Sequence, residues 1–164
     1  MRSLYILNVT VHVLAAFVWL GGMLFLAIVA PILRDLESPE LRSRLFREIG
    51  ERFRWVGWTC IGILLVTGVL NLQFAGVLNA ASLLDASFWA TPYGRTLGGK
   101  LGAVLAMLLI SAVHDFFLGP RATSLLPGSA ESIVFRRRAS YLARVNALLG
   151  LLVVWAAVLI ARGG

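Results

Sequence analysis

Apolar residues fill four long stretches of the chain, and the polar residues gather in the connections between them. The stretches cover residues 4–33, 55–80, 99–118 and 141–161. Each is long enough to cross a hydrocarbon core, which needs roughly 20 helical residues. They lack the alternation of apolar and polar positions that marks a barrel strand. Because backbone groups must pair internally in lipid, the pattern predicts an all-α fold, a single transmembrane domain built as a four-helix bundle.

The connection that precedes the second stretch has a helical pattern of its own. Ser38 and Pro39 form an N-cap and first-turn pair. Apolar residues then recur every four positions among arginines and glutamates, at Leu41, Leu45, Ile49 and Phe53. This spacing predicts an amphipathic helix over residues 39–54. Such a helix either lies in the membrane surface or packs its apolar stripe on the ends of the bundle.

The placement of charge predicts the topology. The connections 34–54 and 119–140 hold ten arginines, whereas the opposite side has only Arg2, Arg95, Lys100 and Arg162. The positive-inside rule therefore places both connections in the cytoplasm and both termini on the outer, periplasmic side of a multi-pass protein of the cytoplasmic (inner) membrane. The net charge of +7 would suggest nucleic acid in a soluble protein. Here the basic residues flank apolar runs, so nucleic-acid binding is excluded and lipid is the expected surrounding.

Few polar side chains interrupt the apolar stretches. An ionisable group there costs about 2 to 3 kcal/mol, so each is a functional candidate. Counted along the helices from the centres of their spans, His12 and Asn71 both lie in the outer half of the membrane, and the Lys100 side chain can reach the same region. These residues predict an outer polar layer. The alternatives are a helix-to-helix hydrogen bond for His12 and snorkelling to the headgroups for Lys100.

A second polar layer is predicted nearer the cytoplasm. His114 lies about 7 Å inward of its span centre, roughly 15 Å from His12 along the membrane normal, so one metal ion or one heme is not expected to bind both. At a similar depth lie Asn146 and Asp115, together with the soft-metal donors Met23 and Cys60, while Met107 shares a helix face with His114. Packing is the alternative for the two methionines.

Several short motifs resemble the CopD family of copper-resistance membrane proteins. The motifs follow one another along nearly the whole chain: His12, Trp19-Leu20-Gly21-Gly22, Pro31, Arg52-Phe53, Thr67-Gly68, Asn71, Tyr93-Gly94-Arg95 and Lys100. The resemblance implies a role in copper uptake or homeostasis, and it points to His12, Trp19, Gly21, Gly22, Thr67, Gly68, Tyr93, Gly94 and Lys100. The histidine and Trp-x-Gly of the first span are also similar, more weakly, to HemJ-type membrane oxidases that bind heme b.

Three hypotheses follow. In the first, copper is accepted at His12 and passes Met107 toward Met23, Cys60 and His114, with a periplasmic copper-binding protein as partner. In the second, heme b is held by His12 in a pocket with Trp19, Asn71, Tyr93 and Lys100. The third is a ligand-free accessory subunit. Since no nucleophile with its base, phosphate loop or carboxylate pair is found, enzyme activity is expected only as heme-dependent oxidoreduction. The sequence is compatible with a homo-oligomer.

Overall fold

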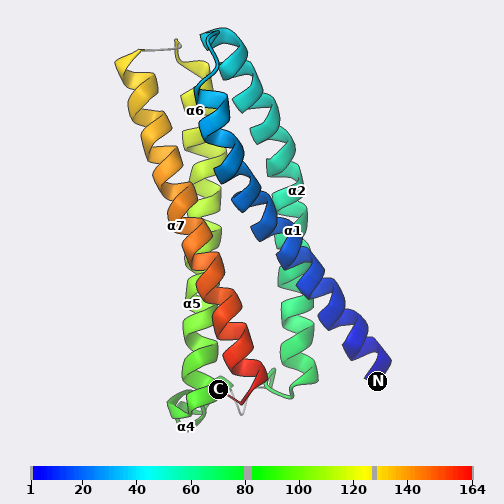
Figure 1. Ribbon diagram of the computed structural model, residues 1–164. Coiled ribbons are helices and arrows are strands. Elements are labelled where there is room, and N and C mark those ends of the chain that lie inside the picture. The colour runs from blue at the N-terminus through cyan, green and yellow to red at the C-terminus, as the bar shows by residue number, and fades with distance from the viewer. Residues whose placement is uncertain (1, 80–82, 127–128, 164) are drawn as a thin grey trace.

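The computed structural model describes residues 2–79, 83–126 and 129–163, and all regular structure in these residues is helical. Four long helices run the length of the molecule (Figure 1). They are α1 (Arg2–Arg34), α2 (Pro39–Phe74), α5 (Pro92–Val113) and α7 (Ala130–Ala161). The shorter elements are α4 (Ala86–Ala90), the π-helix η1 (His114–Leu118) and α6 (Gly119–Ser124).

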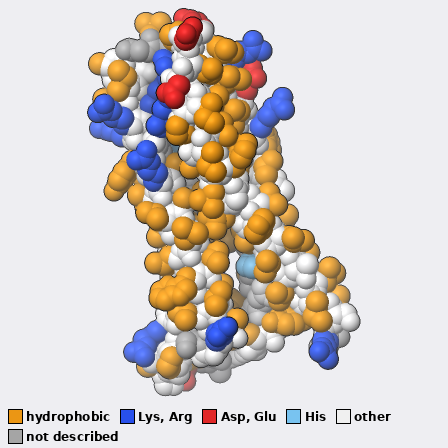
Figure 2. All heavy atoms as spheres, viewed as in Figure 1, with side chains coloured by type: hydrophobic (Ala, Val, Ile, Leu, Met, Phe, Trp, Pro, Cys, Tyr) orange, Lys and Arg blue, Asp and Glu red, His pale blue; other side chains and the backbone are white. Residues whose placement is uncertain are grey.

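The surface of the bundle is suited to lipid. Within the described residues, four helical segments are long and apolar enough to cross a membrane, the third of them running from Pro92 through η1 to Ala122. Large apolar side chains face outward along them; Phe17, for example, is 78% exposed. In Figure 2 apolar side chains cover the middle of the molecule, and the charged ones collect at its two ends. These features confirm the prediction of a helical, multi-pass membrane bundle.

The long helices form two antiparallel pairs. α1 packs along α2, and α5 packs along α7. Both termini lie at one end of the molecule, called the terminal end below, and the opposite end holds the start of α2, α6 and the start of α7 (Figure 1). We call this opposite end the arginine-rich end. Toward the N-terminus α1 leans away from α7, so the two pairs diverge at the terminal end (Figure 1). Which end faces the cytoplasm stays a prediction.

The surface helix and the second span that the sequence suggests are one continuous helix, α2. Its start matches the expected cap, because the Ser38 side chain accepts a hydrogen bond from the Leu41 N–H and Pro39 occupies the first turn. Its end comes at Phe74, whereas residue 80, the expected end, lies outside the described residues. Gly76 has a φ of +69° and ends the helix. The N–H groups of Gly76 and Val77 then return to the carbonyls of Gln73 and Leu72, as in a Schellman motif.

The third span begins earlier than its apolar run. The Thr91 side chain caps α5 by accepting from the Gly94 N–H at 2.9 Å, and Pro92 follows as the first helical residue. Just before it, Asp85 caps the short helix α4 by accepting from the N–H and hydroxyl of Ser87, and these bonds lower the pKa of Asp85. α4 therefore folds back against the first turns of α5.

Candidate functional site

A polar layer joins α1 to α2 in the half of the molecule nearest the termini. The Asn8 amide donates to the Thr67 carbonyl at 3.0 Å and to the Asn71 side-chain oxygen at 2.9 Å. One turn further along α1, His12 Nδ1 lies 2.7 Å from Thr67 Oγ1. Asn8 and Thr67 are buried, and His12 is half-buried. His12 therefore faces the bundle and is engaged with a neighbouring helix, as its position in an apolar stretch requires.

The hydrogen bonds of Thr67 assign the tautomer of His12. The Thr67 hydroxyl has a single proton, and its closest acceptor is the Ile63 carbonyl at 2.6 Å, one turn earlier in α2. Since that proton is committed to Ile63, Thr67 Oγ1 can only accept from His12. His12 Nδ1 then carries a proton, and in the neutral imidazole the lone pair is on Nε2. Within the described residues no hydrogen bond reaches Nε2. Thr67 thus presents a neutral imidazole with its second nitrogen available.

Lys100 approaches the same layer from the other helical pair. It is half-buried on α5 and lies close enough to interact electrostatically with His12. No hydrogen bond joins the two pairs in this half of the described structure. Tyr93 lies two turns nearer the terminal end, where its ring meets Phe88 of α4 edge-on with centroids 6.1 Å apart. The sequence suggested an outer layer of His12, Asn71 and Lys100. In the structure His12 lies near Lys100, and Asn71 is hydrogen-bonded to Asn8.

A second polar layer lies toward the arginine-rich end and joins three helices. The buried Asn146 amide on α7 donates to Ser111 Oγ of α5 at 2.9 Å and lies 4.0 Å from the sulfur of Met23 on α1. The Asn146 side-chain oxygen is buried, with no partner among the described residues. His114 is not part of this contact. Its Nδ1 lies 2.8 Å from a carboxylate oxygen of its neighbour Asp115.

The π-helix η1 explains why Asp115 meets α2. Its wider turn pairs the Gly119 N–H with the His114 carbonyl. In the same register the Asp115 carbonyl would pair with the N–H of residue 120, but that residue is proline and has none. The Arg54 guanidinium of α2 donates to this carbonyl instead, at 3.1 Å. The Trp58 indole, one turn further along α2, donates to the Asp115 carboxylate at 2.9 Å. Asp115 is therefore a link between the two helical pairs.

Trp58→Phe should weaken this link. The substitution keeps an aromatic ring beside Phe116, 5.4 Å away between centroids, but removes the only indole donor to Asp115 in the described residues. We expect a loss of about 1 kcal/mol in the free energy of unfolding, measured in detergent by thermal or denaturant unfolding. The matched control is Trp55→Phe, because Trp55 is 77% exposed. An equal loss in both variants would show that the hydrogen bond contributes nothing specific.

Three of the proposed cofactor and metal residues belong to the packed core. Trp19, Cys60 and Met107 are buried together with Ile61, and Met23 packs against this group. The Trp19 ring fits between two glycines, since a Cβ on Gly57 or on Gly150 would lie 3.7 Å from it. These glycines let α2 and α7 approach α1 closely. The position of Trp19 is thus set by helix packing.

His12, Cys60 and the His114–Asp115 pair do not form one metal site in the described residues. Among the described residues no group of three or more histidine, cysteine, aspartate or glutamate side chains could hold a metal ion. His12 and His114 belong to separate layers, as their depths suggest. Along α2 a groove of 360 Å³ extends between the layers, lined by Trp58, Thr59, Gly62, Ile63, Val66 and Thr67. In Figure 2 the surface is hollowed between the two helical pairs on the side of the terminal end.

Two pairings in the outer layer were not predicted, although the family resemblance pointed to Thr67. Thr67 is the residue that orients His12, and Asn8 is the one that binds Asn71. A signal was present for both, because Asn8 precedes His12 by four residues and Thr67 precedes Asn71 by four, so each pair shares a helix face. Trp58 carried no such signal, since a tryptophan near the end of an apolar run is usually an interfacial anchor.

Comparison with known proteins gives three findings. The family model of copper resistance protein D matches residues 47–160, which run from within α2 through α7, so α1 with His12 lies outside the match. An uncharacterized protein of Aquifex aeolicus is 33% identical over 154 residues, or 93% of this chain and 92% of that protein. The copper transport protein CutJ of Bacillus subtilis is 28% identical over 113 residues, which is 69% of this chain but 19% of CutJ. No solved structure matches significantly.

Proposed function

Because the chain belongs to the copper resistance protein D family, we propose that it handles copper in the membrane and that His12 is the residue that binds the ion. The observation that carries the assignment of the residue is the His12–Thr67 hydrogen bond of 2.7 Å. It orients a neutral imidazole inside a membrane bundle and leaves Nε2 for a ligand. The family match supports the copper, and the geometry of α1 and α2 supports the residue.

The ligands that the protein offers near His12 suit a copper ion that is passed on to another molecule. They suit a permanently bound ion less well. His12 offers one nitrogen, an acceptable ligand for Cu(I). Lys100 is a cation in the same region and cannot help to bind copper while it is protonated. Cys60 and Met107 are packed against Trp19 in the core, so the proposal does not route copper through them. A single protein ligand suits transfer, in which a donor or acceptor protein supplies the remaining ligands.

The orientation of the bundle in the membrane determines the side from which copper reaches His12. The positive-inside rule puts the arginine-rich end in the cytoplasm, so His12 lies in the outer half of an inner-membrane protein. Copper then reaches His12 from the periplasmic side, with a periplasmic copper-binding protein as the supplier. CutJ is named as a copper transport protein, and this chain corresponds to only 19% of its length. We therefore propose that this chain transports copper without the other parts that CutJ has.

The experiment is a Cu(I) titration of the detergent-purified protein against a competing chelator, with an absorption spectrum of the same sample. We expect saturable binding that approaches one equivalent per chain. Failure to bind copper, together with a Soret band, would contradict the proposal and favour the heme b hypothesis. Neither copper binding nor a Soret band would favour an accessory subunit without a ligand.

Thr67 should control the copper affinity without touching the ion. Thr67→Val removes the acceptor for the His12 Nδ1 proton, so the ring is no longer fixed in the tautomer that frees Nε2. Loss of such an outer partner typically lowers metal affinity by about 10- to 100-fold. Thr67→Ser keeps the hydroxyl and should bind Cu(I) like the unmodified protein, measured by the same titration. If the serine variant binds as weakly as the valine variant, then the hydroxyl does not act through His12.

A further inference from the structure

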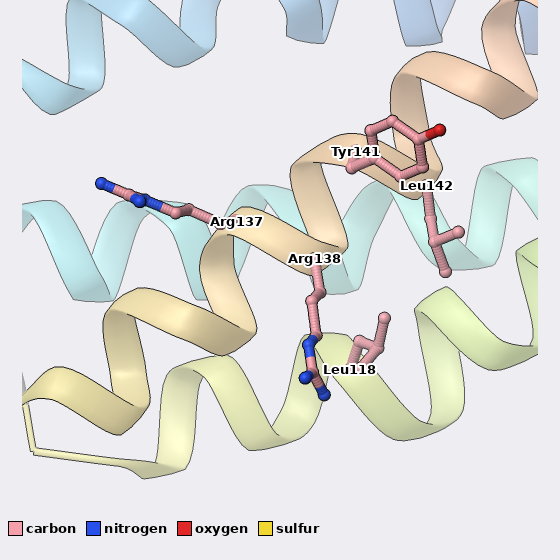
Figure 3. Close-up of a pocket in the computed structure, with 5 residues that line it drawn as sticks. All are labelled: Leu118, Arg137, Arg138, Tyr141 and Leu142. Carbon is pink, nitrogen blue, oxygen red and sulfur yellow. The ribbon is translucent and has the colours of Figure 1, made fainter.

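A groove at the arginine-rich end is separate from both polar layers. It has a volume of 420 Å³ and lies between the end of η1 and the first half of α7. Its lining residues are Leu118, Arg137, Arg138, Tyr141 and Leu142. We call it the arginine groove (Figure 3). On α7 these residues are spaced by one and four positions, which places them on one face of the helix.

The three consecutive arginines of α7, Arg136 to Arg138, have different surroundings. Arg136 is half-buried and reaches across to α2, where it donates to Ser43 Oγ at 3.4 Å. Arg137 and Arg138 are exposed, and within the described residues no hydrogen bond or ion pair engages their guanidinium groups. Arg136 therefore ties the two helical pairs together. The other two leave uncompensated positive charge at the groove.

The rest of the groove is apolar and lies at the level of the membrane surface. Tyr141 is the first residue of the apolar run 141–161, and the arginines come one turn before it. Arg138 and Leu142 extend from α7 toward the helix that carries Leu118, so a charged group sits directly beside an apolar floor (Figure 3). Arg121 of α6 lies over the Phe135 ring of α7 at 5.8 Å, which holds α6 against α7 beside this groove.

We infer that the arginine groove binds one anionic phospholipid, with its phosphate at Arg138 and an acyl chain along Leu118 and Leu142. Arg137, whose side chain extends toward the start of α7, adds positive charge at the edge of the groove (Figure 3). Guanidinium groups pair well with phosphate oxygens. Basic pockets between helices on the cytoplasmic side of a membrane are suited to anionic headgroups. The arginine groove can hold both parts of such a lipid, the phosphate and the acyl chain, because its unpaired guanidinium groups and its apolar floor lie side by side. This inference concerns lipid and does not depend on copper binding at His12.

The test uses the full chain purified in a zwitterionic detergent and titrated with phosphatidylglycerol, with bound lipids counted by native mass spectrometry. The same titration with phosphatidylcholine of identical chains gives the reference. We expect each protein chain to retain one phosphatidylglycerol molecule more strongly than it retains phosphatidylcholine. The double variant Arg137→Gln/Arg138→Gln should lower its apparent affinity by roughly 10- to 30-fold, at about 1 kcal/mol for each arginine. Leu118→Trp, which fills the floor, should also lower it.

The matched control is Arg47→Gln/Arg52→Gln. These arginines are exposed at the same end of the molecule but lie outside the groove, so the loss of charge is equal. The control should keep the phosphatidylglycerol. Equal losses in the two double variants would overturn the inference, because the lipid would then respond only to total charge. Equal retention of phosphatidylcholine would also overturn it, as would displacement of the lipid by free glycerol phosphate at a similar concentration.

Discussion

His12→Ala is expected to abolish saturable Cu(I) binding and to return the copper content of producing cells to that of cells without the protein. The variant removes the nitrogen that we propose as the ligand, and among the described residues no cysteine or methionine lies in the same layer to replace it. His12→Gln gives a sharper test. Glutamine can still donate to Thr67, so the contact between α1 and α2 can persist, but an amide is a poor ligand for Cu(I).

The matched control is His114→Ala, which removes the other histidine of the chain. His114 pairs with Asp115 toward the arginine-rich end, away from the layer that holds His12. This variant should keep the copper affinity of the unmodified protein. Two results would count against His12 as the ligand: normal copper binding by His12→Gln, or an equal loss of binding in His114→Ala. Titration, with thermal unfolding to establish that each variant is folded, separates these cases.

Gly94→Ala is expected to lower the free energy of unfolding by about 3 kcal/mol and the melting temperature by roughly 10 °C. A Cβ at this position would lie 2.9 Å from both the Phe88 carbonyl carbon and the Trp89 Cα, and closer still to the Phe88 carbonyl oxygen. These are backbone atoms, so a side-chain rotation cannot relieve the overlap. The close approach of α4 to the first turn of α5 therefore requires glycine at position 94.

Thermal unfolding in detergent measures this effect, and hydrogen exchange of α4 shows whether that helix is displaced. The matched control is Gly102→Ala, also within α5, where an added Cβ has no neighbour within 4 Å. It should be neutral or slightly stabilising, because alanine favours a helix more than glycine does. Gly22 is a different case, since its added Cβ would meet the Phe53 ring, which can turn away. A melting temperature unchanged by Gly94→Ala would contradict the packing argument.

The helices could be predicted from the sequence because lipid leaves the backbone few other choices. The start of α2 at Ser38 and Pro39 could be predicted as well, but the end of the second span could not. Hydropathy shows where apolar residues begin, and a helix can continue beyond the membrane. α2 starts at Pro39, although its apolar run starts near residue 55, since Ser38 caps it there. It ends at Phe74 because the left-handed Gly76 allows a Schellman turn. The apolar residues that follow Gly76 gave no sign of this end.

The end of the second span affects the predicted depth of the residues on it. With its end at residue 80, the second span has its centre about three residues, or roughly 4 to 5 Å, from the centre of residues 55–74, so the depth of Thr67 relative to His12 is displaced by the same amount. His12 points into the bundle from the same face of α1 as the buried Asn8, Ala15 and Trp19, and the helical spacing of these residues is visible in the sequence. The link from Trp58 to Asp115 could not be predicted, since hydropathy gave no sign of the π-helix η1 that contains Asp115.

The division into two helical pairs bears on how the chain enters the membrane during synthesis. Asn8 and His12 find their partners on α2, and Ser111 finds its partner on α7, so each hairpin pairs several of its intramembrane polar groups internally. The first hairpin can leave the insertion machinery for lipid before the second is made, without an unpaired imidazole facing the acyl chains. Assembly of the finished protein then brings the two hairpins together, and the bonds from Arg54 and Trp58 to Asp115 and from Arg136 to Ser43 form at that step.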